Sequence, residues 1–467
     1  MHRPAKAWRA PIWSRRPAWW TCWQAGPRPS NASWRMGVAN KEGEARDLLH
    51  RMFGAAVDRA KPTRCIADHF PDCPHGRTIV VGAGKAAAEM ARAFEQRWSG
   101  ELTGLVVVPY GHKVPCERIA VREAAHPMSD LAGIAATEQM LALLEKAREG
   151  DLVVCLLSGG GSALLCAPED GVEFDELQNI GRALLNSGAD VAQMNVVRKK
   201  LAKALGGGIA RAAAPASLVT LAISDVVGDD RASIASGPTV PDRTSGDEAM
   251  AILARCGVAI SKAAETILRR PFVDDPKRDI AAYRIIASSR LSLDAAAEIA
   301  HEAGYTVRDL GEVTGEARDV GRDHAEIVRE IVADSGEAAA PCVILSGGET
   351  SVTVEGEGRG GRNGEYLLSL LTELDGMAGV YALAADTDGI DGAGDNAGAW
   401  FEPGMAIRAR ENGHDPRNYL ERQDSHTFFQ AMDRLVMSGP TRTNVNDFRA
   451  ILIQSPEMQQ CRGTPTG

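Results

Sequence analysis

Short runs of apolar residues alternate with amphipathic stretches along most of this 467-residue chain. Such alternation is typical of mostly parallel sheets that helices cover on both faces. It predicts a helix over residues 44–60 and another over 85–98, in which Met90, Phe94 and Trp98 share one buried face. The predicted strands are Thr78–Val81, Leu105–Pro109, Leu152–Leu157, Ser217–Ile223, Arg284–Ala287, Cys342–Leu345 and Val380–Ala384. The fold class is therefore α/β.

The length predicts two α/β domains, because one hydrophobic core rarely organises so many residues. We expect a Rossmann-like N-terminal domain with a mostly parallel sheet over residues 44–310. A polar helical stretch then leads to Pro341, and we expect a second α/β domain over residues 340–452.

The opening of the chain differs from the rest. Residues 1–35 hold six of the eight tryptophans among arginines and prolines, with no acidic residue and no periodicity. They lack the apolar core of a secretory signal, and the prolines would break an amphipathic transit helix. We expect residues 1–40 to be an extension outside the fold, with Met36 as the native start.

Composition excludes several classes of function. The formal net charge is −10, and the acidic body argues against nucleic acid as a partner. No run of 18 apolar residues predicts a membrane span. The nine cysteines form no CxxC pair, which indicates unpaired thiols in a cytoplasmic protein. The sequence is compatible with a monomer or a homodimer.

Glycines follow the predicted strands, at the sheet edge where ligands of α/β proteins bind. Gly82 and Gly84 precede a helix, and Lys85 at its start is suited to a phosphate or carboxylate. This turn lacks the Walker A spacing. A second run can present successive N–H groups and hydroxyls to an anion. It consists of Ser158, Gly159, Gly160, Gly161 and Ser162.

Charged and polar residues stand at further positions near strand ends. On a predicted helix that ends at a glycine triplet, Asn195, Arg198 and Lys199 lie close together, although a cationic helix face is usually solvated. Asp225 follows the strand Ser217–Ile223, where a carboxylate suits Mg²⁺ or a hydroxyl proton.

The second predicted domain repeats this arrangement. Arg362 at a helix start offers a planar fork for phosphate, and the crowding of Asp386 with Asp388 after a strand is costly without a cation. The turn and helix-start residues that we consider candidates for binding are Gly347, Gly348, Glu349 and Asn363.

Ten segments in order carry a family resemblance, which covers residues 44–452. They read GAGKAA, HPMSD, LLSGGGSAL, MNVVRKKLA, ISDVVGDD, IASGPTVPD, LSGGETSVTV, GRGGRNGE, AADTDGIDG and GPTRTNVND. Together they resemble the glycerate 2-kinase family, whose C-terminal half is the MOFRL domain. The resemblance implies a mixed sheet in that domain and an active site in the cleft between the domains.

The activity that the resemblance implies is phosphorylation of D-glycerate to 2-phosphoglycerate by ATP with Mg²⁺. It marks Lys85 and Arg362 as active-site residues. As a hypothesis, the Ser158–Ser162 run holds the nucleotide phosphates. Asp225, Asp386 and Asp388 would bind Mg²⁺ or orient the attacking hydroxyl, which makes Asp225 a third catalytic candidate.

Two other classes of function stay open on the residues alone. Gly82, Gly84 and Ala87 match a loose dinucleotide fingerprint, so an NAD(P)H-dependent hydroxypyruvate reductase is the main alternative. The next strand ends in Pro109 and Tyr110, however, where such a site needs an acid for the ribose. A non-catalytic sugar-acid binding protein would not need two carboxylate clusters beside glycine turns.

Overall fold

The computed structural model describes residues 41–271, 282–334 and 341–454. The predicted extension, residues 1–40 with Met36, lies outside the described residues. The described residues form one compact unit that contains two six-stranded sheets. No helix in these described ranges is long and apolar enough to cross a membrane.

The first sheet is entirely parallel, with the order β3-β2-β1-β4-β5-β6. Its strands are β1 Thr78–Ala83, β2 Leu102–Pro109, β3 Ile119–Ala124, β4 Leu152–Leu157, β5 Ser217–Ile223 and β6 Ala282–Ala287. Every residue of β1 and β4 is buried, because helices cover both faces of the sheet. The carboxyl ends of these neighbouring strands therefore lie at one edge.

Two apolar cores sandwich this sheet. One contains α3, whose Met90 and Phe94 are buried as predicted, together with Trp98 just beyond its end. The other lies under α4 and α8. The helices of these layers are α2 Pro62–Cys65, α3 Ala87–Glu95, α4 Leu131–Leu144, α5 Gly161–Leu164 and α8 Gly208–Ala213. The predicted helix 85–98 is thus shorter at both ends.

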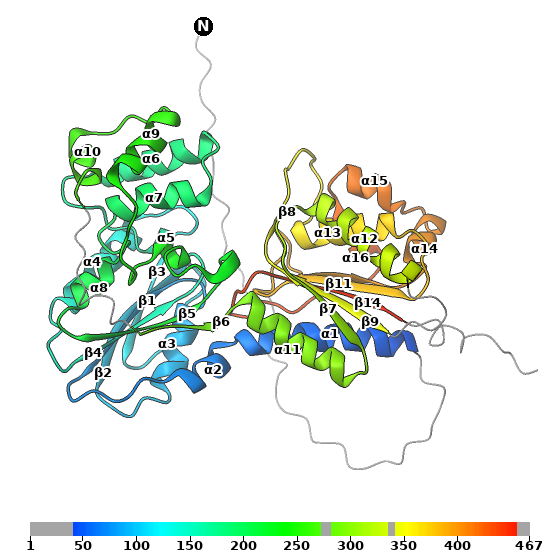
Figure 1. Ribbon diagram of the computed structural model, residues 1–467, viewed down its shortest axis with the longest axis horizontal. Helices are drawn as coiled ribbons and strands as arrows, with labels where there is room; N and C mark the ends of the chain where they lie inside the picture. The colour runs from blue at the N-terminus through cyan, green and yellow to red at the C-terminus, as the bar shows by residue number, and fades with distance from the viewer. Residues whose placement is uncertain (1–40, 272–281, 335–340, 455–467) are drawn as a thin grey trace, which may run out of the picture. The chain divides into compact units, whose positions relative to one another are not determined.

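Four helices form a separate apolar cluster attached to the first sheet (Figure 1). They are α6 Phe174–Asn186, α7 Val191–Leu201, α9 Gly246–Arg255 and α10 Lys262–Leu268. Side-chain caps begin three of them, since Asp190, Ser245 and Ser261 accept backbone N–H groups of the first turn. Three short 3₁₀ turns lie at Ala67–His69, Val227–Asp229 and Ile234–Ser236.

The second sheet is mixed, with the order β13-β12-β11-β14-β9-β7 and only β7 and β9 parallel. Its strands are β7 Thr306–Glu312, β9 Cys342–Gly347, β11 Val380–Asp386, β12 Gly398–Phe401, β13 Leu435–Val436 and β14 Asp447–Ile453. A two-stranded ladder joins β8 Gly315–Glu316 to β10 Thr350–Ser351. The two sheets confirm the predicted α/β fold.

Helices cover both faces of the second sheet (Figure 1). One face carries α12 Ala317–Asp334, α13 Arg362–Glu373, α14 Met405–Glu411, α15 Pro416–Glu421 and α16 Ser425–Ala431. The other carries α1 Lys41–Ala60 and α11 Ser289–Glu302. The second sheet thus draws on residues before 310, while the domain boundaries 44–310 and 340–452 stay predictions.

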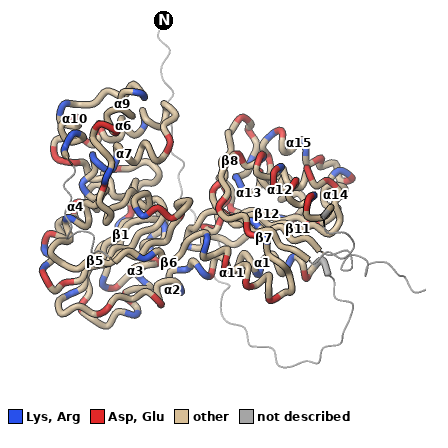
Figure 2. The backbone as a smooth tube through the Cα atoms, viewed as in Figure 1, with Lys and Arg blue, Asp and Glu red and all other residues tan. Residues whose placement is uncertain are grey.

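All seven predicted strands are present, and the structure adds to them β3, β7, β8, β10, β12, β13 and β14. Seven cysteines lie among the described residues and all are free, while Cys22 and Cys461 lie outside them. Basic and acidic positions are interspersed along the backbone (Figure 2).

His324 on α12 is a buried histidine whose Nδ1 lies 2.8 Å from the hydroxyl of Tyr366 on α13. Burial, with a smaller effect of Arg449, lowers the pKa of His324 to about 4. The folded-state pKa is below the unfolded value of about 6.5, so the stability it contributes is present above that pH and is lost as pH falls towards 4.

We therefore expect the free energy of unfolding to fall by about 2 kcal/mol between pH 7 and pH 5 through His324 alone. Urea unfolding of wild type and His324→Gln at both pH values measures this contribution. His301→Gln, at an exposed position of α11, is the matched control. An equal pH dependence in all three proteins would contradict the assignment.

Candidate active site

The turns after β1 and β4 lie against each other. The backbone N–H of Lys85 donates to the carbonyl of Gly159 over 2.8 Å, and the N–H of Ala86 donates to the Ser158 hydroxyl over 3.0 Å. Gly84 has a φ of 133°, and a Cβ there would lie 2.3 Å from the Ser158 hydroxyl oxygen. A side chain is excluded at Gly84 on both grounds. The predicted glycine turns therefore form one continuous backbone surface.

Lys85 extends from this surface to an aspartate that follows the second sheet. Its Nζ lies 3.1 Å from Oδ2 of Asp388, and the two side chains are 30% and 18% exposed. Burial disfavours the charged amine, but Asp388, Asp386 and Asp225 outweigh it and raise the pKa of Lys85. Lys85 is therefore a cation held among carboxylates.

Arg362 begins α13 and binds three carboxylates at once. Its Nε donates to Asp447 over 2.8 Å, Nη1 to Glu349 over 2.8 Å and Nη2 to Asp386 over 2.6 Å. Burial disfavours the charged guanidinium, but these three acids raise its pKa above the ordinary value. Three of the five N–H donors of the Arg362 guanidinium thus bind carboxylates.

One short turn after β11 joins the two cations. The backbone N–H of Asp388 donates to Oδ1 of Asp386 over 2.9 Å, so the partners of Lys85 and Arg362 are adjacent. Burial and the neighbouring acids Asp388 and Asp447 raise the pKa of Asp386, which Arg362 opposes. Lys85 and Arg362, 277 positions apart in the sequence, therefore belong to one charged network. Its acidic members are Asp388, Asp386, Glu349 and Asp447.

Asp225, just after β5, lies beside this network. A Cβ on Gly159 would be 1.9 Å from its Oδ2, so the glycine turn lies directly against the carboxylate. Burial raises the pKa of Asp225 to about 6, against the effect of Lys85 and with that of Glu349. Among the described residues, its carboxylate accepts one side-chain hydrogen bond, a long one of 3.5 Å from the Asn444 amide. The carboxylate therefore keeps free lone pairs.

Three residues near β14 were missed as candidates. Asn446 donates to the carbonyl of Asp225 over 2.8 Å, Asn444 approaches its carboxylate, and Asp447 binds Arg362. Buried Arg449 also donates to Asp447. The segment GPTRTNVND was available as a signal, because it clusters amides and an acid before an apolar run.

Asn363 is buried and supports the network from within. Its amide donates to Asp447 over 2.8 Å, and its backbone N–H donates to Asp391 over 3.0 Å. Asp391 also accepts the N–H of Gly364 over 2.9 Å, so it satisfies the first turn of α13. The structure thus gives Asn363 contacts that hold Asp447 and the helix start in place.

The turn between β9 and β10 supplies Glu349. Gly348 in this turn has a φ of 85°, and Gly347 packs so closely that a Cβ would lie 2.1 Å from the Ser289 hydroxyl oxygen. These glycines set the path of the backbone beside Arg362. Gly82 allows a similarly close approach of two strands inside the first sheet, where a Cβ would lie 2.1 Å from the Leu156 carbonyl oxygen.

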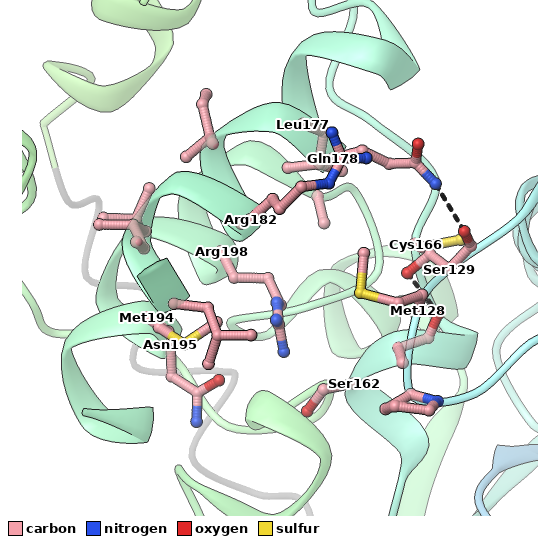
Figure 3. A pocket seen from close by; sticks show the side chains of 18 of the residues that line it. Met128, Ser129, Ser162, Cys166, Leu177, Gln178, Arg182, Met194, Asn195 and Arg198 are labelled. Carbon is pink, nitrogen blue, oxygen red and sulfur yellow. Dashed lines mark hydrogen bonds between the residues drawn. The ribbon is translucent and has the colours of Figure 1, made fainter. Parts of the chain in front are cut away.

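A cavity of about 340 Å³ adjoins the Ser158–Ser162 run. Gly160 and Ser162 line it together with Asn195 and Arg198 of α7 (Figure 3). The Ser162 hydroxyl bonds that of Ser236 over 2.7 Å, and Ser236 in turn donates to Asn195 over 2.9 Å. The predicted binding residues Gly160, Ser162, Asn195 and Arg198 therefore line the same cavity.

Lys199 is not part of this cavity. It lines two other surface pockets, with Pro241 and Asp242, because α7 turns it away from Arg198. The predicted helix was also too long, since α7 ends at Leu201 and Ala202 is extended. Arg198 and Lys199 lie on one helix as predicted but line different pockets, and the binding role of Lys199 stays a prediction.

The predicted acidic trio does not form a ready metal cluster. Within the described ranges, no group of three or more His, Cys, Asp or Glu side chains is placed to hold a metal ion together. Asp386 and Asp388 are each paired with a cation, whereas Asp225 has no ion pair in the described part of the chain. A metal role for Asp225, Asp386 and Asp388 stays a prediction.

Two family descriptions match the chain. Residues 48–269 match a domain of unknown function, DUF4147, and residues 342–447 match the MOFRL family. The first covers most of the first sheet with its helices. The second covers most of the second sheet and Arg362.

Several known proteins are similar over nearly their whole length. A protein of Agrobacterium vitis with the provisional name hydroxypyruvate reductase is 47% identical, over 88% of this chain and 94% of its own. A D-glycerate 2-kinase of Thermotoga maritima is 36% identical, over 84% and 94%. The crystal structure of a glycerate kinase from Thermotoga maritima matches with a TM-score of 0.83 at 34% identity, over 88% of this chain and 100% of that one. The predicted family resemblance is confirmed.

Proposed function

Because the chain belongs to the glycerate kinase family of DUF4147 and MOFRL domains, we propose that it transfers the γ-phosphoryl group of ATP to D-glycerate, giving 2-phosphoglycerate and ADP. The observation that carries the proposal is the shared acidic turn, which ties Lys85 to Asp388 and Arg362 to Asp386. Two cations bound to adjacent aspartates of one turn suit a reaction whose substrates and transition state are all anionic.

Lys85 and Arg362 are the proposed catalytic cations. Phosphoryl transfer depends mainly on positioning and on neutralising charge. In the present structure the carboxylates of Asp388, Asp386 and Glu349 accept hydrogen bonds from some of the N–H donors of these two cations. We propose that the phosphoryl group and the glycerate carboxylate take over part of these hydrogen bonds, in the cleft between the two predicted domains.

Asp225 is proposed to accept the proton of the attacking hydroxyl or to bind Mg²⁺. Mg²⁺ binds oxygen ligands, often one or two carboxylates with substrate phosphates. The free lone pairs of Asp225 fit this requirement, and Asp386 and Asp388 are the further predicted ligands. When bound, the ion would neutralise part of the charge on the nucleotide phosphates.

The Ser158–Ser162 run is the proposed cradle for phosphates. Its backbone lies against both Lys85 and Asp225. Successive N–H groups in such turns suit anions. Gly82, Gly84, Gly347 and Gly348 would act indirectly, by allowing the close approach of the turns.

One assay tests this proposal against the reductase alternative, which the name of the Agrobacterium relative favours. The protein is incubated with D-glycerate and Mg-ATP, and ADP release is followed beside NADH oxidation with hydroxypyruvate. Phosphorus NMR of the product distinguishes 2-phosphoglycerate from 3-phosphoglycerate. NADH oxidation without ADP release would overturn the kinase proposal.

Gly159→Ala provides a structural test of Asp225. The added methyl group would overlap the carboxylate, 1.9 Å from its Oδ2, so Asp225 must move by about 1 Å or more. Misplacement on that scale costs up to ~100-fold in rate, and we expect kcat to fall by tenfold to ~100-fold. The φ of Gly159 is not in the left-handed region, so the variant adds no backbone strain, and we expect its loss of stability to be that of overpacking, about 1–3 kcal/mol. Unchanged kcat would remove Asp225 from the reaction.

A further inference from the structure

The cavity beside the Ser158–Ser162 run is mostly apolar. Its wall comes from α6 and α7 and from the segment after β3 that contains Met128 (Figure 3). The apolar side chains that line it include Met128, Phe174, Leu177, Leu184 and Met194. Ligand sites of proteins are typically concave, mostly apolar and supplied with a few polar groups. D-glycerate is a three-carbon hydroxy acid, too small and too polar to fill such a space.

Arg198 is the unusual group in this cavity. Figure 3 shows its side chain reaching from α7 into the space near Met128 and Ser162. Across the described residues, no hydrogen bond or ion pair to its guanidinium is present, and burial lowers the pKa of Arg198. A half-buried cation without a carboxylate partner is costly. It therefore points to an anionic ligand group.

The cavity and the charged network share one wall. Gly160 and Ser162 face the cavity, whereas the neighbouring Gly159 lies against Asp225 and accepts the N–H of Lys85. A ligand that placed an apolar body in the cavity could therefore lead a chain of anionic groups past Arg198 and over the glycine run to Lys85. A nucleoside triphosphate has this construction.

We infer that the cavity between α6, α7 and the Met128 segment holds the base and ribose of the nucleotide, with Arg198 on the phosphate nearest the ribose. This deepens the proposed kinase function and rests on it. Gln178 fixes part of the wall, since its amide donates to the Ser129 carbonyl over 2.7 Å (Figure 3).

Gly181→Leu tests the inference by filling the cavity. Gly181 lines it from α6, and a Cβ there meets nothing within 4 Å, so leucine can enter without a backbone clash. Leucine is also a better helix former than glycine. Calorimetry should show ATP binding weakened by tenfold to ~100-fold, because the base loses its apolar contacts. Binding of tripolyphosphate, which has no base, should stay within about twofold.

Two further variants complete the test. Gly54→Leu, on an exposed position of α1 with open space around it, is the matched control and should bind both ligands as wild type does. Arg198→Ala should weaken both ATP and tripolyphosphate by about tenfold to 100-fold, as expected for a lost charged hydrogen bond. The KM for glycerate should stay unchanged in all three.

The outcomes separate this inference from the proposed function. ATP binding to Gly181→Leu at wild-type strength would overturn the placement of the base. Arg198→Ala with unchanged affinity for both ligands would overturn the role of Arg198. In either case, continued ADP release with glycerate would leave the kinase proposal standing. Wild type that binds tripolyphosphate but not ATP would defeat both.

Discussion

Replacing Arg362 with alanine should lower kcat by about 10³-fold to 10⁵-fold, as for other arginines that neutralise a transferring phosphoryl group. The expected loss is large because Arg362 donates to Asp447, Glu349 and Asp386 at once. Its removal takes away a fixed cation and leaves three acids in mutual repulsion. Coupled measurement of ADP release at saturating glycerate and ATP gives kcat directly.

The same replacement will also cost stability, since Asp447 and Asp386 are buried. Removing one partner of a buried ion pair costs about 3–5 kcal/mol. Arg318→Ala is a matched control, because it leaves the equally buried Glu365 without its arginine elsewhere on α13. The control should lose stability and keep kcat. A similar loss of kcat in both variants would show that unfolding, not chemistry, explains the effect of Arg362→Ala.

Lys85→Ala should lower kcat by about 10²-fold to 10³-fold, the usual cost of removing one preorganised charge donor from a transition state. The raised pKa keeps Lys85 charged throughout the working pH range. Arginine at this position should restore only part of the activity, because its fork does not reproduce a compact ammonium. Because Lys85 opposes the raised pKa of Asp225, its removal should lower the height of the pH profile of kcat and move its acid limb to higher pH.

Lys200→Ala is the control for Lys85→Ala. Lys200 pairs with Asp242 over 3.1 Å, the same separation as that of Lys85 from Asp388, but in a pocket that no residue of the charged network lines. The variant Lys200→Ala should therefore have the kcat of wild type. If Lys85→Ala also turned over glycerate at the wild-type rate, the charged network would have no part in catalysis.

Strands buried on both faces were predictable because their residues are almost all apolar. Leu152–Leu157 is such a run and coincides with β4. The strand β14 escaped prediction, since its sequence DFRAILI begins with an acid and contains an arginine. These charges are buried against each other, as Arg449 donates to Asp447. Only the tertiary structure shows that the two charges pair with each other, so the sequence pattern alone does not predict this strand.

The candidate site was predictable from position as much as from residue type. Lys85, Asp225 and Asp386 were chosen because they follow predicted strands, and the structure brings them into one region. Helix positions were less predictable. Neighbouring helical residues point about 100° apart, so Arg198 and Lys199 face different surfaces although they are adjacent.

The packing of α1 has a consequence for synthesis. The first described helix lies against β11 and β14 of the second sheet, and β14 is inserted between β9 and β11. On the ribosome, the apolar face of α1 can pack against α11 once residue 302 has emerged, but its contacts with β14 form only when almost the whole chain has emerged. Contacts so distant in sequence form slowly, and exposed apolar surface invites aggregation meanwhile. Overproduction at low temperature or with a chaperone should favour recovery of the folded protein.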